Sequence, residues 1–207
     1  MKKTLLAIAA LTALTSGAAM AQQQDGKWMV RVRAVHIESD NGGSTNLPGV
    51  GSLGLSASNK TIPELDISYF FTPNFAAELI LTYPQKHDVR SSALGGKIGT
   101  VKQLPPTLLA QYHFTNLGAF KPYVGAGINY TRFSNVNLLD GGADVKRNSW
   151  GGALQVGFDY ALDKNWSINF DVKKVYMKTD VSVNGVGKVG DLKIDPVLIG
   201  VGVGYRF

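Results

Sequence analysis

Charged side chains recur at every second position of several segments, and they are the residues best suited to chemistry. Carboxylates held beside guanidinium or ammonium groups can act as general acids and bases, so an acid–base site is one interpretation. Networks of such pairs also serve as structure, and here four positive charges nearly balance five negative ones. We therefore favour a compensated network inside the fold. The nine residues are Arg31, Arg33, Glu64, Asp66, Glu78, Asp159, Asp171, Lys173 and Arg206.

Other motifs that could support catalysis or metal binding are incomplete. The three histidines share no ligand spacing, so we predict no metal site and no cofactor. The segment HDVRSS at 87–92 contains hydrolase-type residues but lacks the strand–turn–helix setting of a nucleophile elbow. The glycine pairs are followed by no helix, so they do not form phosphate loops. The sequence predicts that the protein is not an enzyme.

The first 21 residues have the pattern of a secretory signal peptide. Two lysines precede a short apolar run, and an Ala-Met-Ala cleavage site ends at residue 21. We expect Sec-type export, removal of residues 1–21, and a single domain formed by residues 22–207. In that domain 19 basic residues stand against 15 acidic ones without a basic run, so no nucleic-acid partner is expected. The chain contains no cysteine, which excludes disulfides and thiolate chemistry.

Apolar and polar residues alternate in eight segments of the predicted mature chain, which is typical of strands with two different faces. No segment shows sustained helical periodicity. After the signal, no apolar run approaches the about 18 residues that a membrane helix needs. The predicted strands are 28–36, 64–71, 75–83, 107–114, 123–131, 153–160, 166–176 and 197–207.

The connections between these strands alternate in length. Those after the second, fourth and sixth strands are short, whereas those after the first, third, fifth and seventh are long and rich in Gly, Ser, Asn and Asp. An even strand number with short turns at one end and long loops at the other describes an outer-membrane barrel. The fold class predicted is all-β: an eight-stranded antiparallel transmembrane β-barrel with short periplasmic turns and long extracellular loops.

The direction in which the apolar face points decides between a membrane barrel and a soluble lipocalin-type barrel. Charges in the lipid would each cost about 2–4 kcal/mol, so the charged face must point inward. Aromatic residues at strand ends also favour lipid, because they form interfacial girdles. On the short-turn side these are Trp28, Tyr69, Phe71, Phe75, Tyr112, Phe114, Tyr160, Trp166, Tyr205 and Phe207; on the other side they are Tyr83, Tyr130 and Tyr176.

The partners expected for such a barrel are outer-membrane lipid and lipopolysaccharide. Arg132 and Lys174 fall near the outer interface, where they either contact lipid phosphates or extend into solvent. We expect a monomer in the bacterial outer membrane.

Five long motifs lie along the chain: TYPQKHDV at 82–89, KQLPPTLLAQYHF at 102–114, PYVGAGINYTRF at 122–133, NSWGGALQVGFDY at 148–160 and DPVLIGVGVGYRF at 195–207. On these motifs the chain resembles the outer membrane protein W (OmpW) family over nearly its whole mature length. The resemblance implies a narrow, partly apolar lumen that passes small hydrophobic molecules. One departure is Val197, where the family usually has tryptophan after Asp-Pro.

The candidate lumen and gate residues come from strand alternation and from the resemblance. Ile80 and Trp150 occupy family positions associated with an apolar constriction. Strand alternation also points the Ile80 side chain inward. It points Trp150 outward, unless a bulge at Gly151-Gly152 turns the indole inward. The other inward apolar candidates are Met29, Phe70, Leu109 and Leu198.

The adjacent prolines Pro105 and Pro106 are a candidate lateral exit, because proline removes ladder donors; an ordinary strand start is the alternative. The predicted function is passive uptake of small hydrophobic molecules across the outer membrane. The alternative is a structural, adhesive or receptor barrel with a fully plugged interior that acts through its extracellular loops. The identity of the solute and the direction of its exit stay open.

Overall fold

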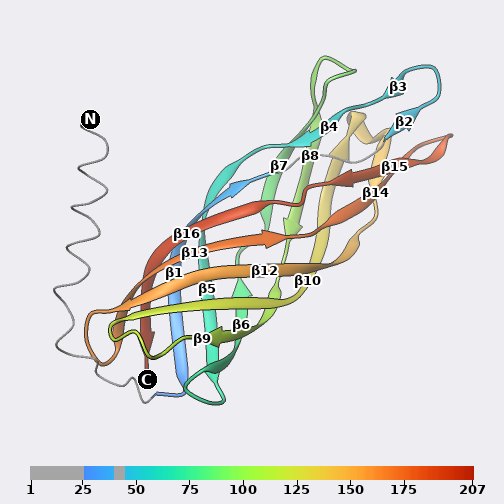
Figure 1. Cartoon of the computed structure of the whole chain (residues 1–207). Coiled ribbons are helices and arrows are strands. Elements are labelled where there is room, and N and C mark those ends of the chain that lie inside the picture. The colour runs from blue at the N-terminus through green and yellow to red at the C-terminus, as the bar shows by residue number, and fades with distance from the viewer. Residues whose placement is uncertain (1–25, 40–44) are drawn as a thin grey trace, which may run out of the picture.

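The structure, a computed structural model, describes residues 26–39 and 45–207; the predicted signal peptide, residues 1–21, lies outside them. Within the described residues, eight antiparallel strands close into a barrel in the order β12-β13-β16-β1-β5-β6-β9-β10, and β10 pairs β12 (Figure 1). The barrel strands are β1 (Trp28–Glu38), β5 (Lys60–Phe70), β6 (Phe75–Leu81), β9 (Thr107–His113), β10 (Phe120–Leu138), β12 (Asn148–Ala161), β13 (Trp166–Val175) and β16 (Val197–Arg206). The predicted all-β barrel is confirmed.

The long connections are more ordered than their composition suggests. They continue the barrel wall upward as further paired strands rather than as irregular loops (Figure 1). A hairpin of β7 and β8 follows β6, and a second of β14 and β15 follows β13. These upper elements are β2 (Asn46–Leu47), β3 (Gly51–Ser52), β4 (Leu55–Ala57), β7 (Gln85–Ser91), β8 (Gly96–Leu104), the 3₁₀ turn Leu139–Gly141, β11 (Ala143–Val145), β14 (Lys178–Val183) and β15 (Gly187–Lys193).

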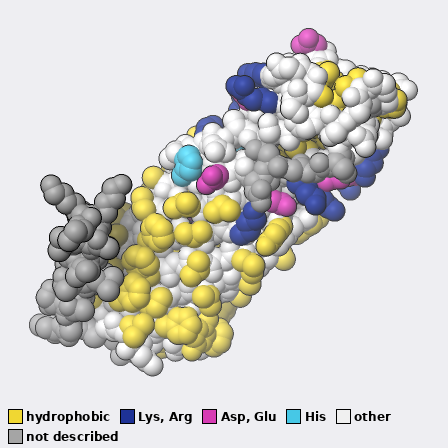
Figure 2. Space-filling model, turned by 45° about the horizontal axis from the view of Figure 1, so that its top comes forward, with side chains coloured by type: hydrophobic (Ala, Val, Ile, Leu, Met, Phe, Trp, Pro, Cys, Tyr) yellow, Lys and Arg dark blue, Asp and Glu magenta, His cyan; other side chains and the backbone are white. Residues whose placement is uncertain are grey.

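Alternation along the strands separates an apolar exterior from a polar interior. On β1, Val32 is 54% exposed, whereas its neighbours Arg31 and Arg33 are buried. Hydrophobic side chains cover the lower part of the surface in Figure 2, and Lys and Arg gather toward the upper part. Because water would not favour so large an apolar surface, the exterior fits a lipid environment. Among the described residues, helices long and apolar enough to cross a membrane are absent.

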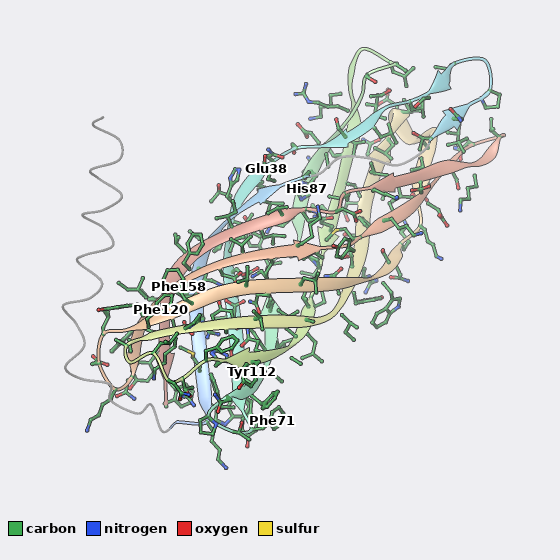
Figure 3. All side chains as sticks on the ribbon, viewed as in Figure 1. Glu38, Phe71, His87, Tyr112, Phe120 and Phe158 are labelled. Atoms are coloured by element: carbon green, nitrogen blue, oxygen red, sulfur yellow. The ribbon has the colours of Figure 1, made fainter. Side chains whose placement is uncertain are left out.

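Aromatic residues mark both ends of the apolar exterior. Phe71, Tyr112 and Phe120 lie toward the short-turn end of the barrel, whereas His87 lies in the upper part (Figure 3). Neighbouring strands contribute edge-to-face pairs at the lower end, such as Trp28 with Tyr69, whose ring centroids are 4.8 Å apart. Such pairs suit the lower membrane interface, where amphipathic rings are favoured.

The first and last strands join to close the wall. Arg31 on β1 lies opposite Gly204 on β16, and the ladder runs from the Met29–Arg206 pair upward. The amide of Trp28 donates to the carbonyl of Phe207 at 3.1 Å, and the amide of Phe207 donates to the carbonyl of Trp28 at 2.9 Å. No edge is therefore left between these two strands.

Candidate functional site

A layer of buried ions fills the barrel below its middle, and Arg31 is one of its two centres. The Arg31 guanidinium donates from Nε to Asp159 Oδ1 at 3.0 Å and from Nη2 to Asp159 Oδ2 at 2.6 Å. Its Nη1 donates to Glu78 Oε2 at 2.5 Å and to Ser68 Oγ at 2.9 Å. A bidentate pair of this kind fixes both the position and the angle of the guanidinium.

Arg33 forms the second centre, one inward position higher on β1. Its nitrogens lie 2.6 Å from Asp66, 3.3 Å from Glu64 and 3.3 Å from Asp171. The ammonium of Lys173 lies 2.6 Å from Glu64 and 3.2 Å from Asp171. Eight of the nine predicted charges, all but Arg206, thus meet inside the barrel, where they compensate one another.

Small and neutral residues complete this layer. Gln155 donates to Glu78 Oε1 at 2.9 Å, and the Tyr123 hydroxyl donates to Asp171 at 3.1 Å. On β16, a Cβ at Gly202 would lie 2.8 Å from Arg33 Cγ and 2.1 Å from the carbonyl oxygen of Val32. Glycine is required there because the arginine stem and the neighbouring strand occupy the space of a side chain.

Arg206 lies toward the periplasmic end of the layer. Its guanidinium stacks on the Phe70 ring at 3.7 Å from the centroid, and its Nε donates to the Gly26 carbonyl at 2.6 Å. Met29, Phe70 and Ala76 form a small buried apolar cluster of their own at this end. Met29 and Phe70 were expected to line the same lumen as Ile80, and that expectation is wrong: the ion layer separates them from it.

A narrow apolar cavity lies directly above the ions. Its walls include Ile37, Ile62, Ile80 and Leu198, and Glu64 with Lys173 lies at its floor. The free space is about 30 Å³, enough for a group of the size of one or two water molecules. Two predicted lumen residues, Ile80 and Leu198, therefore face this cavity. Leu109 is buried two register pairs below Ile80, opposite Glu78.

The wall beside the cavity is interrupted by prolines. Ladder pairing between β6 and β9 ends at Ile80–Thr107, and pairing between β7 and β8 begins at Gln85–Gln103. Among the described residues, no backbone hydrogen bond joins 82–84 to 105–106 across this gap. On the other side of the prolines, β10 holds them in place: Asn129 Nδ2 lies 3.3 Å from the carbonyl oxygens of Pro105 and of Pro106, and the amide of Tyr130 donates to the carbonyl of Pro106 at 3.1 Å. We call residues 82–84 and 105–106 the seam.

Trp150 lies on the outer surface and does not contribute to the lumen. Its side chain is 69% exposed, and its ring centroid lies 4.8 Å from that of Tyr130. The β10–β12 register continues through Gly151 and Gly152 without a shift, so no bulge turns the indole inward. The lumen expectation for Trp150 is wrong, and its place in an upper aromatic ring follows from plain alternation.

The polar residues at the top of the cavity, Gln85 and Gln103, are not among the predicted site residues, because the sequence pattern predicts a long loop between residues 83 and 107. Both are buried and line the cavity. A signal for them exists in the sequence: Gln85, His87 and Val89 alternate with charged residues, as in a strand. Within the described residues, no group of three or more potential ligands is placed to hold a metal ion.

The comparisons with known proteins agree with this geometry. The profile of the OmpW family matches residues 24–207. The chain is 51% identical to the uncharacterized outer-membrane protein y4mB of Sinorhizobium fredii, over 87% of this chain and 80% of that protein. It is 36% identical to outer membrane protein W of Escherichia coli over the full length of both. The crystal structure of OprG from Pseudomonas aeruginosa matches with a TM-score of 0.79 and 32% identity, covering 91% of this chain and 99% of that one.

Proposed function

Because this chain belongs to the OmpW family of outer-membrane barrels, we propose that it admits small hydrophobic molecules passively across the bacterial outer membrane, after Sec-type export. The observation that carries this proposal is the apolar cavity, which lies above the ion layer and beside the seam. In this proposal an apolar solute binds in the cavity and leaves it sideways through the adjacent seam. No cofactor takes part.

The ion layer supports a sideways route over a straight one. Arg31, Arg33 and Lys173 are each held by carboxylates and have at most 1% of their surface exposed. An uncharged apolar solute passing downward would have to separate these pairs, and removing a partner from a buried pair typically costs about 3–5 kcal/mol. The seam has no ladder bonds to break, so opening it costs far less.

The height of the seam supports release into lipid. Tyr83 belongs to the seam, and Tyr130 follows the cavity residue Asn129; both tyrosines belong to the upper aromatic ring. Because aromatic rings mark the membrane interface, a solute leaving here would enter the outer lipid leaflet. The cavity is smaller than any such solute, so entry must displace side chains from the walls.

The function is tested in proteoliposomes that carry lipopolysaccharide in their outer leaflet, with entry of toluene compared with entry of a sugar. We expect toluene to enter faster than into vesicles without protein and the sugar not to do so. Replacing Ile80 by glutamate should reduce toluene entry at least several-fold without preventing insertion, because a charge would stand in the apolar wall. Toluene entry no faster than in vesicles without protein would end the proposal.

The lateral route is tested by the double replacement Pro105→Thr and Pro106→Thr. Threonine restores the backbone donor at both positions: that of residue 106 faces Tyr130 on β10, and that of residue 105 faces the seam, so ladder pairing can extend across the seam and toluene entry should fall. Pro122→Thr is the matched control, because Pro122 lies in β10 near the short-turn end. Equal loss in the control and the double variant would show that the seam is not the route.

A receptor role is the second candidate, and the ordered upper strands favour it. The apolar cluster that begins at the cavity continues upward through residues such as Leu53, Val89 and Leu138, so the extracellular part is packed around the same hydrophobic core. A rigid surface of this kind suits recognition by another molecule. Removal of the β14–β15 hairpin separates the two roles: it should abolish recognition while leaving toluene entry intact.

A further inference from the structure

Two glutamines face each other at the top of the cavity. Gln85 on β7 and Gln103 on β8 are partners in the strand register, and both line the cavity. Gln85 is 0% exposed and Gln103 is 2% exposed. Buried amides require hydrogen-bond partners for the carbonyl oxygen as well as for the nitrogen. Which end of each amide faces the protein therefore determines what the cavity can bind.

The orientation of Gln85 follows from its backbone neighbour. Its Nε2 lies 2.9 Å from the carbonyl oxygen of Tyr83 and 3.4 Å from Thr82 Oγ1. A carbonyl oxygen can only accept, so the amide nitrogen has to occupy this position. Flipping the amide would bring two acceptors together. The carbonyl oxygen of Gln85 therefore takes no part in these two contacts and remains available to accept a hydrogen bond.

The orientation of Gln103 follows from the tautomer of His87. The Nδ1 of His87 lies 3.1 Å from the carbonyl oxygen of Ser58, so Nδ1 must carry a proton and donate it. Burial lowers the pKa of His87, which favours the neutral ring with an acceptor at Nε2. Gln103 Nε2 lies 3.1 Å from that atom and donates to it. The amide oxygen of Gln103 likewise remains available to accept a hydrogen bond.

Both amide oxygens are buried and have no hydrogen-bond partner among the described residues. We propose that the cavity binds small apolar molecules through a hydrogen-bond donor, a hydroxyl group placed at Gln85 Oε1 or Gln103 Oε1. This inference rests on the proposed function and narrows the solute class to hydroxylated apolar molecules such as phenols. His87 acts as a positioning residue, because it holds the Gln103 amide in the accepting orientation.

The dimensions and charges of the cavity agree with such a ligand. Free space of about 30 Å³ suits a hydroxyl group, while the hydrocarbon part would displace the apolar walls near Ile80 and Leu198. At the floor, Lys173 and Glu64 neutralise each other at 2.6 Å, so neither of them is an unpaired charge that would attract an ion. The cavity thus favours neutral molecules with one polar end.

Phenol and toluene test the proposal, because they differ only by a hydroxyl in place of a methyl group. Dissociation constants are measured by NMR titration of the protein in lipid nanodiscs, following the side-chain amide signals of Gln85 and Gln103. In the double variant Gln85→Leu and Gln103→Leu both acceptors are lost. The matched control is Lys86→Leu with Lys102→Leu, which places two leucines at an adjacent register pair on the outer face.

We expect the phenol-to-toluene affinity ratio of the wild type to exceed that of the glutamine variant by about three- to tenfold, the effect of one neutral hydrogen bond. The lysine control should keep the wild-type ratio. Phenol should shift the two amide signals of the wild-type protein, a readout that remains if the double variant does not fold. If the double variant does not fold, the phenol-to-toluene affinity ratio is measured on the single variant Gln103→Leu instead.

An unchanged ratio in the glutamine variant, or amide signals that do not respond to phenol, would overturn the proposal and mean that water alone meets these oxygens. The entry of toluene into proteoliposomes separates this failure from that of the proposed function. If toluene enters while the ratio is unchanged, uptake stands without hydroxyl recognition. If phenol binds with the expected ratio while toluene does not enter, the site stands without transport.

Discussion

Arg31 provides the sharpest test of the ion layer, and the variant Arg31→Met removes its charge while keeping much of its length. The wild-type guanidinium makes two hydrogen bonds to Asp159 and one each to Glu78 and Ser68. Removing one partner of a buried pair costs about 3–5 kcal/mol. Because two carboxylates lose a partner here, we expect the free energy of unfolding to fall by an amount near the upper end of that range.

The loss of Arg31 should destabilise the two carboxylates, Glu78 and Asp159, by different amounts. Glu78 keeps Gln155 as a donor at 2.9 Å, Ser68 at 3.0 Å and Arg33 at 3.6 Å. Asp159 keeps the Asn169 amide at 2.9 Å as its remaining partner in this layer. Adding Asp159→Asn to Arg31→Met should therefore restore about 2 kcal/mol, and Glu78→Gln should restore less.

Urea unfolding of the barrel in lipid vesicles, followed by tryptophan fluorescence and by gel mobility with and without heating, measures these differences. Lys164→Met is the control, because Lys164 lies exposed in a short turn and its loss should change stability by less than about 0.5 kcal/mol. If Arg31→Met costs less than about 1 kcal/mol, or if Asp159→Asn restores nothing, the layer is not the compensated network inferred from the contacts.

Two further replacements test the packing of the wall. Gly202→Val should destabilise the barrel by about 1–3 kcal/mol in the same urea titration, because its side chain would meet Arg33 and the neighbouring strand; stability equal to wild type would contradict this. Trp150→Ala should leave toluene entry unchanged, because the indole lies outside, and should lower stability by about 1 kcal/mol through loss of its contact with Tyr130. A clear fall in toluene entry would mean that Trp150 contributes to the path of the solute.

Strand positions in the membrane were predictable because lipid outside and ions inside impose strict alternation. The eight barrel strands lie where the pattern places them, and the charges from Arg31 to Lys173 face inward as expected. Above the membrane this contrast weakens, since water replaces lipid and charged residues such as Lys86 stand outside. The strands β7, β8, β14 and β15 were missed for that reason.

Strand alternation predicts whether a side chain points into or out of the barrel. It does not predict the position of that side chain along the barrel axis or the residue that it contacts. It placed Met29 and Ile80 on the same inner face, although the ion layer lies between them. It could not show that Gln103 meets His87, because that contact depends on how the β7–β8 hairpin pairs. Family position suggested an inner role for Trp150, and the uninterrupted register decided against it.

The junction of β1 with β16 has a consequence for how the protein is made. The two strands that close the cylinder are the first and the last of its eight strands along the chain, so all the barrel strands have to be synthesised before the last ladder can form. Contacts of such long sequence separation slow folding, and until they form two bare strand edges remain open to other chains. These edges therefore need shielding until the barrel closes, and the rate of closure rather than the final stability should limit the yield of inserted protein.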